Sequence, residues 1–372
     1  KVAVPARSRR PRPELYLPTD AEMLAARQDF EQPLTFDPHV TVQATGLGPW
    51  AGKDPVDAIT RVRGELGDPH LSYLPELADR GYRATLLARS IAALEGLSAD
   101  GTAAGWRLTR GYSAEGDYAT SLLASDINAL ADVVGREKGT PTGTLKIRLL
   151  GPVSLAVQTY LTNGERALSD HGARRDLAES QLAGLHSLLG LLREAAPGSN
   201  LLVQFEEPHL IHAAQGTIKT SSGYRIIRSI PRHELVSLMT QAQAGVHDVG
   251  AQPVVSVDYL ALHPEIQAVL EAPIVDSQGL PTSAWEPLAA HLEAGRSLYL
   301  PTVDIHHKTP AGSLAGSLWS TWRDLGLGKD LLNQLVLTER GNLADTDPAR
   351  ATTVLNHLTE TARALSEIGQ DS

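Results

Sequence analysis

Short apolar runs alternate with amphipathic stretches along most of this chain of 372 residues. In the amphipathic stretches the apolar residues recur at helical spacing, as Leu182, Leu185 and Leu188 do. Strand-like runs separated by such helices are typical of βαβ units around a parallel sheet. The predicted strands are His39–Leu47, Leu145–Leu150, Asn200–Phe205, Pro253–Val257, Ala272–Val275, Ser297–Val303 and Gln334–Thr338. The predicted helices are Asp54–Glu65, Arg174–Glu194, Arg232–Val246, Ala284–Ala294 and Pro348–Ile368.

Several predicted strands are apolar on both faces, which indicates a sheet that is covered on both sides. Leu201, Leu202 and Val203 are consecutive apolar residues of one such strand. About seven or eight strand–helix units follow one another, and this number favours a closed barrel over an open doubly wound sheet. The first strand is not followed by a glycine-rich dinucleotide-binding motif, which also counts against the open sheet. The sequence therefore predicts an α/β fold, a single (β/α)8 barrel of the TIM type over residues 39–372.

The first 38 residues differ from the rest in composition and are predicted to form an arm ahead of the barrel. Arginines and prolines are mixed there, at Arg7, Arg9, Arg10, Arg12, Pro5, Pro11 and Pro13. Because proline disfavours helix, we interpret residues 1–38 as a solvated or packed-down tail, with contact to an anion or a partner as the alternative. The whole chain has 33 Lys and Arg against 43 Asp and Glu, a net charge of −10. This balance gives no general attraction to nucleic acid, so no nucleic-acid partner is expected.

The chain contains no cysteine. Disulfides, thiol catalysis and thiolate-bound metals are therefore excluded. No apolar run reaches transmembrane length and no apolar segment of signal-peptide type follows the basic start. These features predict a cytoplasmic protein without a membrane partner.

Polar residues are concentrated where the predicted strands end. In (β/α)8 barrels the working residues lie at this carboxyl face. The strand ends include Glu206-Glu207-Pro208, Ser256-Val257-Asp258, Asp276 and Asp304-Ile305-His306. The pattern predicts a binding face for a small molecule.

Four segments resemble the cobalamin-independent methionine synthase family, in its short, barrel-only form. They occur in the family's order and span about residues 40–368: Ala44-Thr45-Gly46-Leu47-Gly48-Pro49-Trp50, Leu150-Gly151-Pro152-Val153-Ser154, Gln204-Phe205-Glu206-Glu207-Pro208, and Leu337-Thr338 with Gly341-Asn342-Leu343-Ala344. The uroporphyrinogen decarboxylase superfamily is a more distant relative with the same barrel. The resemblance implies methyl transfer from a reduced folate to the thiol of homocysteine, in methionine biosynthesis.

The resemblance also implies a zinc ion that activates the substrate thiol. The family's ligands are His-x-Cys after one strand, a carboxylate after the next and a cysteine after the last. The corresponding positions here are Ser256, Asp258, Asp276 and Gly341, so only one ligand of four is kept in kind. No metal and no other cofactor is therefore expected, although zinc is the cofactor of the family.

The predicted catalytic residues are Glu206, Glu207, Asp304 and His306, and the predicted substrate-binding residues are Gly48, Trp50, Ser256 and Asp258. Adjacent carboxylates at a strand end are costly to desolvate, so a function is preferred for the glutamates, with support of the barrel loops as the alternative. Asp304 and His306 are two apart and share a face of an extended strand, with His307 pointing away; a purely structural role is the alternative. The carboxylates and His306 are expected to converge on one cavity.

Four other candidates stay open between binding and structural roles. Lys146 and Arg148 alternate along one strand and either hold a carboxylate ligand or form salt bridges inside the barrel. His209 and His212 could share a helical face. His263 precedes a proline and is interpreted as a capping or packing residue. Trp50 either forms the wall of a pocket for a flat ligand or packs in the core.

The predicted function is that of a methionine synthase-like protein acting on a small amino-acid-like or folate-like molecule, with a degraded zinc site. If it is active, it is a methyltransferase. Two alternatives remain: a catalytically inactive paralog that binds a small molecule, and a decarboxylase or hydrolase using Glu206, Glu207, Asp304 and His306.

Overall fold

Eight parallel strands surround one axis in the computed structural model, which describes residues 40–103, 105–109, 111–137 and 143–371. The strands are β1 (Gln43–Ala44), β2 (Leu71–Tyr73), β5 (Gly143–Leu150), β7 (Ser199–Glu206), β8 (Gln252–Ser256), β9 (Pro273–Ile274), β10 (Leu298–Asp304) and β11 (Leu335–Arg340). The predicted arm of residues 1–38, and His39 in the first predicted strand, lie outside the described residues.

The barrel closes between two short strands, β1 and β2. Neighbouring strands pair in parallel from β2 through β5 to β11, and β11 pairs with β1. Thr45, just after β1, forms a parallel bridge with Leu71 of β2, and its Oγ1 donates a hydrogen bond to the Leu71 carbonyl at 2.7 Å. The prediction of a (β/α)8 barrel is confirmed.

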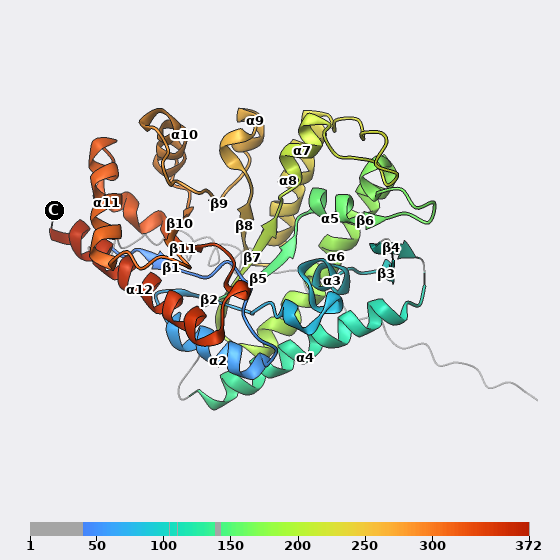
Figure 1. The fold of residues 1–372 in the computed structure, drawn as a ribbon, viewed down its shortest axis with the longest axis horizontal. Helices are drawn as coiled ribbons and strands as arrows, with labels where there is room; N and C mark the ends of the chain where they lie inside the picture. The colour runs from blue at the N-terminus through green and yellow to red at the C-terminus, as the bar shows by residue number, and fades with distance from the viewer. Residues whose placement is uncertain (1–39, 104, 110, 138–142, 372) are drawn as a thin grey trace, which may run out of the picture. The chain divides into compact units, whose positions relative to one another are not determined.

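Helices cover the outside of the barrel (Figure 1). They are α2 (Pro55–Glu65), α3 (Leu86–Ala92), α4 (Ala114–Arg136), α5 (Pro152–Gln158), α6 (His171–Ala195), α7 (Leu210–Gln215), α8 (Arg232–Asp248), α9 (Pro264–Gln267), α10 (Thr282–Glu293), α11 (Ala311–Asp324) and α12 (Pro348–Asp371). Short 3-10 turns occur at Ala78–Arg80, Tyr82–Ala84, Ala167–Ser169, Tyr259–Ala261, Lys329–Gln334 and Leu343–Asp345. All five predicted helices are present with shifted ends. None of the described helices is long and apolar enough to cross a membrane.

The sequence analysis missed several elements. Strand β2 is only three residues long, too short for an alternating pattern, although all three are buried. Helix α4 was overlooked despite buried Leu123, Ile127 and Leu130 at helical spacing. Helix α11 is rich in glycine, alanine and serine, which weakens its apolar signal. A small sheet of β3 (Ser98–Thr102), β4 (Gly105–Thr109) and β6 (Thr159–Tyr160) lies beside the barrel and was also not predicted.

The barrel interior has an apolar layer and a polar layer. The apolar layer contains one or two residues from each of six strands or strand edges: Leu71, Leu202, Val254, Ala272, Ile274, Tyr299 and Val336. Nearer the carboxyl ends, Lys146 and Gln204 are fully buried, whereas their neighbours Ile147 and Val203 belong to the core under the helices. Since successive strand residues point to opposite faces, Lys146 and Gln204 point inward. The fold therefore presents polar groups along the axis below the carboxyl face.

One close approach sets the position of α6. A Cβ atom at Gly184 would lie 1.7 Å from the carbonyl oxygen of Ala93, whereas nothing lies within 4 Å of the Cβ position at Gly190 in the same helix. We expect Gly184→Ala to destabilise the chain by about 1–3 kcal/mol, because a backbone oxygen cannot turn away. We expect the matched control Gly190→Ala to stabilise it by about 0.5–1 kcal/mol, because alanine favours helix. Urea unfolding measures both. A shift of both midpoints in the same direction would contradict this packing.

Candidate functional site

Six polar or charged side chains form a connected group at the carboxyl end of the barrel. They come from β5, β7, β11 and the segment after β2, and all are buried except Arg148, whose side chain is 17% exposed. We call this group the barrel-mouth cluster: Glu76, Lys146, Arg148, Gln204, Glu206 and Glu339.

Arg148 joins two carboxylates of the cluster. Its Nη1 donates to Glu76 Oε2 at 2.9 Å, and its Nε lies 3.0 Å from Glu206 Oε1 in an ion pair without hydrogen-bond alignment. Gln204 Nε2 donates to the same Glu206 oxygen at 2.5 Å. Burial alone lowers the pKa of Arg148, but Glu206 and Glu76 raise it above its ordinary value. The guanidinium therefore stays charged and fixes both carboxylates.

Lys146 and Glu339 lie deeper in the barrel. Lys146 Nζ donates to the carbonyl of Gly46 at 2.6 Å and to Gln204 Oε1. Burial lowers the pKa of Lys146, and Glu339 and Glu206 oppose this shift. Burial raises the pKa of Glu339, whose Oε1 accepts the Leu47 N–H at 2.8 Å. The sequence left two roles open for Lys146 and Arg148, binding of a carboxylate ligand or salt bridging inside the barrel. In the structure Lys146 forms hydrogen bonds and Arg148 forms salt bridges inside the barrel.

Besides Arg148 Nε, two buried polar atoms in or beside the barrel-mouth cluster have no hydrogen-bond partner among the described residues. They are Glu339 Oε2 and the hydroxyl oxygen of Tyr73. The Tyr73 hydroxyl packs on Gly46, whose Cβ position lies 2.7 Å from it. Buried polar atoms are normally paired, so these two represent unused hydrogen-bonding capacity in the polar layer.

The turn after β1 lies directly on Arg148. Gly48 has a φ of +126°, and a Cβ there would lie 2.6 Å from Arg148 Cδ. Only glycine combines this backbone conformation with so close an approach. Trp50, two residues later, is fully buried in the core with its Nε1 unpartnered. Of these two predicted substrate-binding residues, Gly48 contacts the cluster and Trp50 packs in the core.

Glu206 and Glu207 are adjacent but face different surroundings. Glu207 is 1% exposed and accepts hydrogen bonds from Val153 N at 2.9 Å, Ser154 N at 2.8 Å and Ser154 Oγ at 2.7 Å. A Cβ at Gly151 would lie 2.3 Å from Glu207 Oε1, so glycine is needed next to it. Glu207 therefore holds the start of α5, while Glu206 belongs to the barrel-mouth cluster.

The carboxylate of Asp304 pairs with the side chain of His307, whereas it contacts only the backbone N–H of His306. Its Oδ1 accepts the backbone N–H of His306 at 2.8 Å and lies 3.0 Å from His307 Nδ1. Hydrogen bonding by the His306 N–H, then by the His307 side chain, lowers the pKa of Asp304. The expectation that Asp304 and His306 share a strand face was wrong, because β10 ends at Asp304 and the chain turns there.

Among the predicted catalytic residues, Asp304 lines a cavity at the carboxyl end of β10. A cavity of about 280 Å³ is lined by Asp304, His307, Arg340 and His357, and its lining does not include Glu206, Glu207 or His306. Asp258 is exposed and Ser256 is half-buried.

His263 caps α9, its Nδ1 accepting the Glu265 N–H at 3.2 Å, which agrees with its capping interpretation. His209 is half-buried with an unpartnered Nδ1, and His212 is exposed and contacts Thr217.

The positions that correspond to zinc ligands do not fit a zinc ion. Asp276 is held by Arg340, with Nη2–Oδ1 at 2.9 Å and Nε–Oδ2 at 3.1 Å. Gly341 has a φ of +112°, and a Cβ there would lie 2.8 Å from Ile305. Within the described ranges, no three His, Cys, Asp or Glu side chains are grouped so that they could hold a metal. The residues present therefore do not provide the imidazole and thiolate ligands that zinc prefers.

Glu76, Glu339 and Arg340 were not identified from the sequence. Glu76 follows β2, the strand that was missed, so its place at a strand end was hidden. Glu339 and Arg340 lie one and two positions beyond the predicted end of β11. The sequence placed both at the carboxyl face but did not single them out as site residues.

One comparison with known proteins, that with solved structures, supports the barrel architecture. No protein-family model and no curated protein matches the sequence. Among solved structures, a B12-independent methionine synthase from Shewanella sp. W3-18-1, in complex with selenomethionine, superposes with a TM-score of 0.55 at 12% identity. The alignment covers 89% of this chain and 98% of that one. The chain therefore has a barrel fold similar to that of this methionine synthase. A β-1,4-D-mannanase from Cryptopygus antarcticus gives a TM-score of 0.39 at 9% identity, over 86% of this chain and 90% of that one.

The barrel-mouth cluster should depend strongly on Arg148. We expect Arg148→Met to destabilise the methionine synthase-like barrel by about 3–5 kcal/mol, because Glu76 and Glu206 would remain buried without a counter-ion. The exposed Arg175, which pairs with Asp176, provides the control. We expect Arg175→Met to change stability by less than about 0.5 kcal/mol. Urea unfolding compares the two. If Arg148→Met and Arg175→Met lower the stability equally and only slightly, the barrel-mouth cluster carries little buried charge.

Glu207 should make stability depend on pH. Burial raises its pKa to about 7, although hydrogen bonds from Ser154 and Val153 lower it. The folded state then binds this proton more tightly than the unfolded state, so stability falls as pH rises through the range from about 4.5 to about 7. Between about pH 5 and about pH 8, we expect the native chain to lose roughly 2–3 kcal/mol relative to Glu207→Gln.

The measurement is urea unfolding of both proteins at both pH values. Glu179→Gln is the control, since this carboxylate is exposed and 3.7 Å from Arg175. It should follow the native pH profile. A constant difference between the native chain and Glu207→Gln would show that Glu207 is ionised throughout this range.

Proposed function

We propose that this methionine synthase-like barrel binds a small amino-acid-like molecule at its mouth without zinc, and that it does not catalyse zinc-dependent methylation of a thiol. The observation that carries the proposal is the ion pair between Arg340 and Asp276. Asp276 corresponds to the one zinc ligand kept in kind. Its negative charge is already balanced by a guanidinium from β11, which lies two strands away from β9 in the barrel.

The surroundings of this pair support the proposal. Arg340 Nη2 also donates to the carbonyl of Pro301 at 2.7 Å, so the guanidinium is anchored at a second point. A divalent ion at Asp276 would have to displace an anchored cation and would meet no soft ligand. Without a metal-bound thiolate, a thiol stays largely protonated and nucleophilic attack on a methyl donor is slow.

The barrel-mouth cluster supports the binding part of the proposal. The side chain of Glu206 is 11% exposed, more than that of Glu76 at 7%, and Glu339 is fully buried. Arg148, 17% exposed and paired with Glu76 and Glu206, lies beside it, so a zwitterion would meet both signs of charge by sharing the contacts of this ion pair. Methyl transfer from a reduced folate is the activity that the resemblance implies. An assay of homocysteine methylation tests for it directly.

Elemental analysis of protein purified without added metal tests the zinc part. We expect much less than one zinc per chain, and no methylation of homocysteine from methyl-folate with or without added zinc. Near-stoichiometric zinc, or turnover that a chelator abolishes and zinc restores, would overturn the proposal.

Calorimetry with L-methionine and with L-homocysteine in the presence of a chelator tests the binding part. We expect binding that Glu206→Gln weakens about tenfold, because a charge-assisted hydrogen bond is lost. Glu265→Gln is the matched control: Glu265 is exposed and pairs with Arg232 outside the mouth, so its loss should leave binding unchanged. Thermal unfolding confirms that both variants are folded. Equal effects of the two substitutions, or no binding of either amino acid, would contradict the proposal.

A further inference from the structure

A second cavity lies on the carboxyl-end rim, outside the barrel mouth. It measures about 260 Å³ and is bounded by the loop between β10 and α11 and by the first half of α12. Its lining includes His307, Lys308, Thr309, Arg350, His357 and Glu360. His307, Thr309 and His357 also line the cavity of about 280 Å³ at Arg340, so the two cavities adjoin. We call the 260 Å³ cavity the rim cleft.

Two cations of the rim cleft have no carboxylate partner among the described residues. Lys308 is exposed and makes no ion pair. Arg350 donates from Nε and Nη2 to the carbonyl of Ile305, at 3.0 and 2.8 Å, which leaves Nη1 without a partner. Most other arginines near the carboxyl face, such as Arg148 and Arg340, are paired with carboxylates. The rim cleft therefore has an excess of positive charge.

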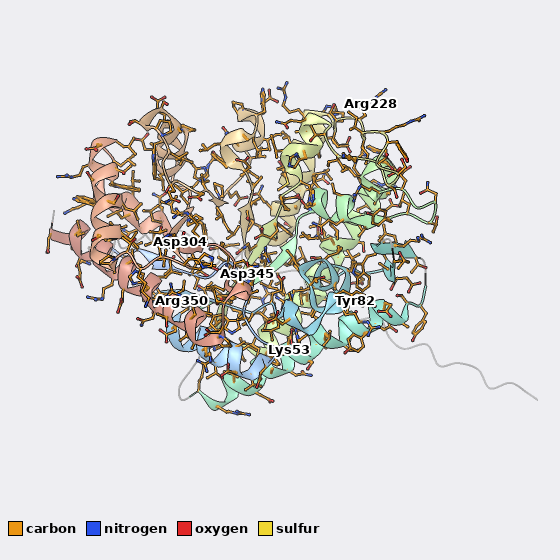
Figure 2. All side chains as sticks on the ribbon, viewed as in Figure 1. Lys53, Tyr82, Arg228, Asp304, Asp345 and Arg350 are labelled. Carbon is orange, nitrogen blue, oxygen red and sulfur yellow. The ribbon has the colours of Figure 1, made fainter. Side chains whose placement is uncertain are left out.

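The rim cleft is also held in shape. The Ile305 carbonyl fixes the direction of the Arg350 guanidinium, and His357 Nε2 lies 2.7 Å from the carbonyl of Thr309. These contacts connect α12 to both ends of the loop that carries His307 and Lys308. Figure 2 shows Arg350 and Asp304 on this side of the barrel. A preorganised site loses less entropy when a ligand binds.

Two carboxylates lie beside the histidines of the rim cleft. Glu360 lines the cleft and lies 3.6 Å from His357 Nδ1, and Asp304 lines only the adjoining cavity and pairs with His307. With Glu360 counted, Lys308 and Arg350 still leave the lining of the rim cleft with a net positive charge. The lining also includes the hydroxyl of Thr309 and the amide of Asn356, whose Nδ2 uses one of its two hydrogens in a bond to Glu65 Oε2 at 3.3 Å. Unpaired cations together with hydroxyl and amide donors are the groups that hold oxyanions in proteins.

We propose that the rim cleft binds the oxyanion group of a small metabolite, with Arg350 and Lys308 as the charged contacts. The shared chemistry is a phosphate or carboxylate group. The volume lies just below the ~300–1,000 Å³ of pockets for drug-sized ligands, so the ligand is a small molecule. No residue of the barrel-mouth cluster lines the rim cleft, and this site is therefore separate from the one in the proposed function.

Calorimetry of the full chain with inorganic phosphate tests the proposal, at constant ionic strength set with sodium chloride because salt screens exposed charges. We expect phosphate to bind, and Lys308→Gln and Arg350→Gln each to weaken it about tenfold. Lys329→Gln is the matched control. Lys329 is exposed in the 3-10 turn before β11, makes no ion pair in the described structure, and loses the same charge on substitution. It should leave the dissociation constant within about twofold of the native value.

A second arm uses succinate under the same conditions. Tighter binding of succinate than of phosphate, with the same dependence on Lys308 and Arg350, would support the proposal and assign the oxyanion as a carboxylate; the reverse order would assign a phosphate. Thermal unfolding checks the fold of Arg350→Gln, and Lys308→Gln on the exposed loop keeps the test valid if Arg350→Gln unfolds. The proposal is overturned if neither anion binds, or if Lys329→Gln weakens binding as much as Lys308→Gln. The barrel-mouth experiments do not affect this result, because they use different residues and ligands.

Discussion

The guanidinium of Arg148 is the interaction on which the carboxyl end of the barrel depends. It lies between Glu76 and Glu206, and its burial is tolerable only because both carboxylates compensate its charge. The turn at Gly48 then rests on the arginine side chain, which requires a residue without a Cβ. The conformation of the β1 turn, the segment after β2 and the end of β7 are thus coupled through one side chain.

The interior of the barrel contains a polar layer below its carboxyl end. In many barrels this space is occupied by branched apolar residues. Here Lys146 and Gln204 replace them, and the Gly46 carbonyl accepts a hydrogen bond from the lysine. Glu339 Oε2 and the Tyr73 hydroxyl remain without partners next to this lysine. A layer with unused hydrogen-bonding groups directly below the mouth is suited to holding a polar ligand.

The barrel is similar to that of a methionine synthase, but the side chains at its carboxyl end do not provide the zinc ligands that the resemblance implies. The backbone follows a methionine synthase barrel over most of both chains at 12% identity. Yet Asp276 is bound to Arg340, and Gly341 has no room for a side chain beside Ile305. A fold fixes where strand ends meet, whereas the side chains at those ends decide what is bound there.

The sequence by itself determined the barrel, because the alternation of apolar runs and amphipathic helices needs no knowledge of distant contacts. It also placed Glu206, Asp276 and Asp304 at the carboxyl face, since each follows an apolar run. It could not determine which charges meet. Glu207 faces the start of α5 although it neighbours Glu206, and Asp304 meets His307 because the chain turns after β10. Strand β2, with Glu76 behind it, is defined by pairing with β5 and by the bridge to Thr45 and not by its three residues. Partners such as Arg148 and Glu76 are 72 positions apart in the sequence, so only the tertiary structure, through packing around the closed barrel, decided which groups form the site.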